Sequence, residues 1–204
     1  MIEMRERIGV INSLIVWPVP ALFVREMCYL QLRHICEVLA IGCLAAQGDF
    51  KTLKAFRKEY RPPQIFNALR SLYPNFFPQP AKRTWVAGRH HLQGLNYSAA
   101  YDEQRISSLW SGAGDKLHRL SVDKYLKKSF GPEDSDLSDI KAHVEGVTHL
   151  LSGHVIPLNQ NGEEKTLFHV EIEATPGPIH AHFLNFDSTH STVEIESFKA
   201  ELMQ

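Results

Sequence analysis

The sequence predicts an α+β protein, in which an N-terminal bundle of about six helices carries a C-terminal three-stranded antiparallel β-meander. Apolar residues recur at helical spacing through much of residues 19–128, whereas three short runs within residues 154–186 alternate as strands do. The 204 residues suffice for one main hydrophobic core. We therefore expect residues 1–135 to form the bundle, and residues 136–204 to add a helix and the meander as part of one compact unit.

The first predicted helix, residues 19–47, is apolar on nearly every face and ends before Gly48, a residue suited to a helix C-cap. Such a helix belongs at the centre of a bundle. Its cysteines, Cys28, Cys36 and Cys43, have a spacing that suits neither a metal site nor a disulfide framework. We expect buried free thiols and a cytoplasmic protein. The apolar stretch near the start is interrupted by polar residues and prolines, so we expect neither a signal peptide nor a membrane span.

Proline and glycine mark the boundaries of the later helices. The proline-rich residues 73–88 are expected to wrap the bundle irregularly, anchored by Phe76 and Phe77. Gly112 and Gly114 are expected to interrupt or soften the helix that contains them. Five helices are expected after the first: residues 51–60, residues 63–73, two within residues 96–128, and one along residues 140–151.

The C-terminal part changes to the two-residue period of strands. Three strand-like runs are separated by turn signals, and an antiparallel meander is the simplest way to connect them. The tail, residues 192–204, predicts a last short helix or an extra strand. The three expected strands are residues 154–158, 166–174 and 179–186.

The charge of the chain gives no general attraction to nucleic acid, because the formal net charge is -1. The most basic stretches, residues 51–61 and 115–128, are interrupted by acidic and apolar residues. We interpret both stretches as solvated helix faces.

One group of charged residues lies on the apolar central helix. Glu26, Arg33 and Glu37 are separated by seven and four residues, which brings them onto one helical face. We interpret them as a structural ion-pair triad, because an unpaired buried charge is costly. In the alternative, Arg33 and Glu37 form a catalytic site with Asp115 and His118, which are three residues apart on a later helix.

Two sequence motifs carry a resemblance to known proteins. They are "YLQLRHICEVLAIGCLAAQGDF" at residues 29–50 and "GDKLHR" at residues 114–119. The region from about residue 20 to residue 128 resembles a group of uncharacterised bacterial helical proteins and, more loosely, the HEPN superfamily of helical bundles. Many HEPN members are RNA-cleaving toxins or defence proteins. The resemblance implies a helical bundle and makes ribonuclease activity one hypothesis.

The active HEPN ribonucleases carry an arginine followed four to six residues later by a histidine on one helix. His118 has no such arginine before it, since Arg105 is too distant. Arg83 and His90 have six residues between them but lie in a stretch bordered by proline and glycine. We therefore expect the bundle fold without intrinsic ribonuclease activity.

The predicted hairpin at residues 168–186 sorts its side chains by chemistry. A loop of two or four residues sets Glu173 opposite His180 and Glu171 opposite His182. In that register one face holds only polar side chains, namely His169, Glu171, Glu173, His180 and His182. The other face holds only apolar side chains, namely Phe168, Val170, Ile172, Ile179, Ala181 and Phe183.

The polar face has two interpretations. In the first, histidines and glutamates pair across a solvated sheet surface, and no cofactor is bound. In the second, His169, Glu171, His180 and His182 hold zinc, which accepts imidazole and carboxylate ligands, with His149 or His154 as a further ligand. We expect the solvated face.

These observations favour a non-enzymatic or accessory interaction module that contacts a protein partner or a second copy of itself through an exposed hairpin or edge strand. The alternative is a hydrolase, either a HEPN-like ribonuclease acting on RNA or a metal-assisted enzyme that uses the histidine face. A membrane role is not expected.

Overall fold

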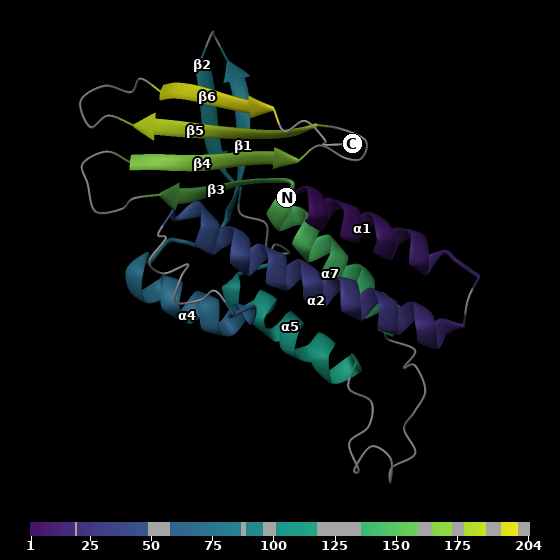
Figure 1. Ribbon diagram of the computed structural model, residues 1–204. Coiled ribbons are helices and arrows are strands. Elements are labelled where there is room, and N and C mark those ends of the chain that lie inside the picture. Colours follow the sequence, from purple (N-terminus) through teal and green to yellow (C-terminus); the bar gives the residue numbers. More distant parts are fainter. Residues whose placement is uncertain are drawn as a thin grey trace.

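The structure is a computed structural model that describes residues 1–18, 20–48, 58–86, 89–95, 101–117, 136–158, 165–172, 178–186 and 193–199. It confirms the α+β class, although the described elements differ in number from those predicted (Figure 1). The helices are α1 (Ile2–Ile15), α2 (Ala21–Ala46), α4 (Pro62–Leu72), α5 (Glu103–Leu117) and α7 (Asp136–Leu151). The strands are β1 (Gln79–Val86), β2 (Arg89–Gly94), β3 (Gly153–Leu158), β4 (Lys165–Ile172), β5 (Ile179–Phe186) and β6 (Val193–Lys199).

Helix α2 lies at the centre of the bundle, as predicted, and contacts α1, α4, α5 and α7. Its three cysteines are free and buried, and Gly48 follows it with a φ of 65°, which only glycine adopts easily. By length and composition alone α2 could cross a membrane. Half of its most apolar window is buried inside the protein, and a core helix meets the same criteria.

Two helical predictions need correction. The first predicted helix begins at residue 19, but residues 2–15 form the additional helix α1, which packs on α2. Helix α5 runs unbroken through Gly112 and Gly114. A Cβ on Gly114 would lie 2.7 Å from Nη1 of Arg33, so this glycine leaves room for the Arg33 guanidinium against α5 and does not end the helix. Most of the helix predicted at residues 51–60 lies outside the described residues.

The described strands form one antiparallel sheet in the order β2-β1-β3-β4-β5-β6. The meander of β3, β4 and β5 was predicted, and the tail forms the extra strand β6. The hairpin of β1 and β2 is a correction, because residues 73–88 were expected to be irregular. Its strands lack a clear alternation of polar and apolar residues, and β1 joins β3 through only two residue pairs, at Gln79 and Pro80.

The sheet is covered on both faces. His154, Ile156 and Val170 point to the helical side and are buried there. On the opposite side the β1–β2 hairpin crosses the sheet (Figure 1). A Cβ on Gly153 would lie 2.6 Å from the carbonyl oxygen of Ala81, which shows how closely β1 passes over this face.

Candidate functional site

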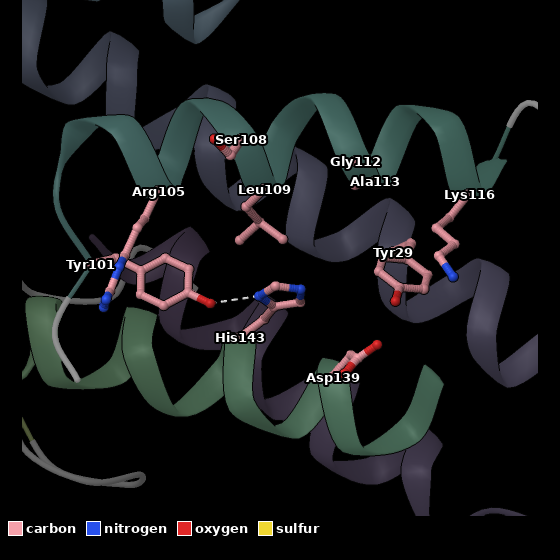
Figure 2. A pocket seen from close by; sticks show the side chains of 10 residues that line it. All are labelled: Tyr29, Tyr101, Arg105, Ser108, Leu109, Gly112, Ala113, Lys116, Asp139 and His143. Carbon is pink, nitrogen blue, oxygen red and sulfur yellow. Dashed lines mark hydrogen bonds between the residues drawn. The ribbon is translucent and has the colours of Figure 1, made fainter. Parts of the chain in front are cut away.

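A cleft lies between α5 and α7 and is bounded on a third side by Tyr29 of α2 (Figure 2). Its volume is about 400 Å³. Along α5 the lining residues recur every three or four positions, which places them on one helical face. Gly112 leaves the centre open, since a Cβ there would meet no atom within 4 Å. The lining residues are Tyr29, Tyr101, Arg105, Ser108, Leu109, Gly112, Ala113, Lys116, Asp139 and His143.

Tyr101 and His143 form a hydrogen-bonded pair in this cleft. The Tyr101 hydroxyl oxygen lies 2.5 Å from Nδ1 of His143, and the bond can form with either group as the donor. Burial lowers the pKa of His143, and the nearby Asp139 partly opposes this. Burial also raises the pKa of Tyr101. Both groups are therefore neutral at pH 7 and satisfy each other.

A buried ion cluster centred on Asp136 lies beside the cleft. The Asp136 side chain is 1% exposed, and its two oxygens lie 2.9 Å from Nε of Arg25 and 2.8 Å from Nζ of Lys116. The Tyr29 hydroxyl donates a longer hydrogen bond of 3.5 Å to the same carboxylate. Lys116 thus belongs to both the cluster and the cleft. This group was not predicted, because the last expected helix began at residue 140, after Asp136. An arginine at position 25 of an apolar helix is nevertheless a signal for a buried partner.

The predicted charged group on α2 is present in part. Nε of Arg33 lies 3.2 Å from Glu37, and its guanidinium lies 4.4 Å from the ring centre of Trp110. The indole nitrogen of Trp110 also donates to Glu37, over 2.9 Å. Glu26 is half-buried and Asp115 is exposed. His118 lies outside the described residues, so its part in a catalytic group with Arg33 and Glu37 stays a prediction.

The histidine hairpin has the predicted sorting of faces but a different register. Glu171 lies opposite His180, and His169 lies opposite His182, so the pairing is shifted by two residues. A shift of two preserves the faces, because side chains alternate with a period of two. Glu173 lies outside the described residues. Towards their other ends both strands add leucine to this face, with Leu167 opposite Leu184.

The expectation of a solvated histidine face is wrong. His169 is 0% exposed and His182 is 4% exposed, on the face of the sheet that the β1–β2 hairpin crosses (Figure 1). From β1 the Arg83 side chain contacts Glu171, with a nitrogen–oxygen distance of 3.4 Å. Burial lowers the pKa of His169 to about 4, opposed by Glu171. The imidazole is therefore neutral at pH 7.

Three of the four predicted metal ligands converge. The ligand atoms of His169, Glu171 and His182 all lie within 4.8 Å of one another. The half-buried ring of His180 stacks against that of His182, with ring centres 6.3 Å apart. His154 points to the helical side of the sheet, opposite Val170, and His149 lies on α7 beside Glu145. Neither belongs to the converging group.

No protein-family model matches the chain, and no curated protein or solved structure is significantly similar to it. The resemblance to bacterial helical proteins and HEPN bundles therefore stays a prediction, as do the expected protein partner and the cytoplasmic location.

Proposed function

We propose that this protein is a non-enzymatic binding module that takes a small organic anion in the cleft between α5 and α7. One observation carries the proposal: Arg105 and Lys116 stand at opposite ends of a cleft whose middle is largely apolar (Figure 2). A ligand with a carboxylate or phosphate group and an apolar body matches that arrangement.

The size and chemistry of the cleft support such a ligand. Its 400 Å³ lies in the usual range of about 300–1,000 Å³ for small-molecule sites. Leu109 and Ala113 supply an apolar floor, and the ring of Tyr29 adds an aromatic wall. The exposed Arg105 offers a planar fork of donors that matches carboxylate or phosphate oxygens.

The state of the reactive groups favours binding over catalysis. Tyr101 and His143 are bonded to each other, so neither is poised towards a substrate as a general acid or base. The cysteines are not activated nucleophiles, because burial raises the pKa of Cys28 to about 11 and raises the pKa values of Cys36 and Cys43 as well.

The test uses the full chain and a panel of probes that includes inorganic phosphate, nucleoside monophosphates and aromatic carboxylates, measured by calorimetry and thermal shift. A hit should be lost in Gly112→Leu, which fills the open centre of the cleft. The matched control is Gly42→Leu, an identical change at an exposed position of α2 where a Cβ also meets nothing within 4 Å. Arg105→Gln should weaken binding about tenfold or more. Failure of every probe, or equal binding by both leucine variants, would contradict the proposal.

A ribonuclease is the second candidate, because Arg105 and His143 line the same cleft and could supply in space the arginine and histidine that HEPN ribonucleases carry on one helix. Incubation of the parent and His143→Ala with structured and single-stranded RNA distinguishes the two candidates. We expect no cleavage by either protein. Cleavage by the parent that disappears in the variant would favour the enzyme.

A further inference from the structure

We propose that His169, Glu171 and His182 bind a divalent transition metal ion, with zinc as the best match to the donor set. Two imidazoles and one carboxylate, leaving a fourth position for water or another ligand, form a common zinc environment. This inference concerns the face of the sheet beneath the β1–β2 hairpin and is independent of the cleft.

The sheet register places the three ligands together. His169 and His182 are direct cross-strand partners on β4 and β5, and Glu171 follows two residues after His169 on the same face. Their ligand atoms lie within 4.8 Å of one another. Zinc bonds of about 2.1 Å in a tetrahedral site hold ligand atoms about 3.4 Å apart. Side-chain adjustments of under about 1 Å therefore close the site around an ion.

The burial of His169 is the second observation that points to a ligand. Its ring is 0% exposed, and both ring nitrogens lack a hydrogen-bond partner among the described residues. A buried nitrogen without a partner destabilises a fold, so such groups usually have a reason to be there. Its Nε2 already lies 3.7 Å from Oε1 of Glu171, and a metal ion between them would give this nitrogen a partner.

The surroundings suit a structural ion. Arg83 of β1 holds both oxygens of Glu171: its Nη2 donates to Oε2 over 3.4 Å, and its backbone N–H donates to Oε1 over 3.3 Å. Oε1 keeps a second lone pair on the side of His169. Partners of this kind orient the carboxylates that bind metals. The ion would join β4 to β5 directly, and Arg83 connects the β1–β2 hairpin to the same carboxylate. We therefore expect metal binding to raise the stability of the fold.

The experiment uses the full chain, stripped by a chelator and dialysed. Calorimetry with zinc chloride should give one saturable site per chain, and zinc should raise the melting midpoint. Cobalt(II) should give the visible absorption band of a tetrahedral site. Glu171→Gln and His182→Gln should each weaken zinc binding at least tenfold. Should His182→Gln fail to fold by circular dichroism, Glu171→Gln decides, since it is isosteric and its side chain is 25% exposed.

The matched control is His149→Gln, because His149 lies 3.5 Å from Glu145 on α7 and is an alternative surface site for zinc. This variant should bind zinc as the parent does. Three results would overturn the proposal: no saturable binding by the parent, unchanged binding by Glu171→Gln, or loss of the site in His149→Gln alone.

Discussion

Asp136→Asn tests whether the buried ion cluster holds the helices together. The substitution keeps the shape of the side chain and removes the charge that faces Arg25 and Lys116, at 2.9 and 2.8 Å. These partners come from α2 and α5, while Asp136 begins α7. One carboxylate therefore links three helices that meet at the cleft.

The magnitude follows from the burial of each partner. Arg25 is 9% exposed, so its guanidinium cannot reach water easily, and stranding a buried charge costs about 3–5 kcal/mol. The side chain of Lys116 is 27% exposed and can turn into the cleft, which adds less than about 1 kcal/mol. At about 2–4 °C per kcal/mol for a chain of this size, the melting midpoint should fall by roughly 10 °C.

Urea unfolding followed by circular dichroism measures the change, and Asp139→Asn is the matched control. Asp139 lies one turn further along α7 and is exposed, so the same substitution there should change stability by at most about 0.5 kcal/mol. A double variant that adds Arg25→Met to Asp136→Asn should recover part of the loss, because no buried charge is then stranded. Equal unfolding midpoints for Asp136→Asn and Asp139→Asn would refute the cluster.

Two further predictions concern the sheet. Gly153→Ala should destabilise the fold by about 1–3 kcal/mol, because the new Cβ would lie 2.6 Å from the carbonyl oxygen of Ala81. The control is Gly94→Ala, where a Cβ meets nothing within 4 Å, and similar melting midpoints for the two variants would contradict the prediction. Stability should also fall with acid, because burial lowers the pKa of His154 to about 4 from 6.5. Between pH 6.5 and pH 4 the unfolded chain binds a proton at His154 and the folded chain does not. The free energy of unfolding therefore decreases as the pH falls from 6.5 towards 4. Urea unfolding at several pH values should show a smaller decrease in the free energy of unfolding with acid for His154→Leu than for the parent. An equal pH dependence in the two proteins would contradict the role given to His154.

The periodic spacing of apolar residues was sufficient to predict the central helix and the three strands of the meander. The all-round apolar character of residues 19–47 predicted α2 as the central helix, and alternation predicted β3, β4 and β5. The β1–β2 hairpin escaped prediction because its residues do not alternate, and its attachment to the sheet depends on β3, far along the chain. The role of Gly114 in α5 could not be predicted locally, because it depends on Arg33 of another helix.

The candidate sites could likewise be predicted only where they depend on local sequence. The parity of the hairpin predicted that His169, Glu171 and His182 share a face, and parity survives an error of two residues in register. Whether that face meets water depends on β1, whose Arg83 reaches Glu171 from a segment expected to be irregular. Burial keeps the imidazole of His169 neutral and removes the water that would otherwise satisfy its nitrogens, and the spacing of residues along a strand does not reveal this burial. A ligand set can therefore be nominated from one strand pair, but its capacity to bind metal is decided by the segment that covers it.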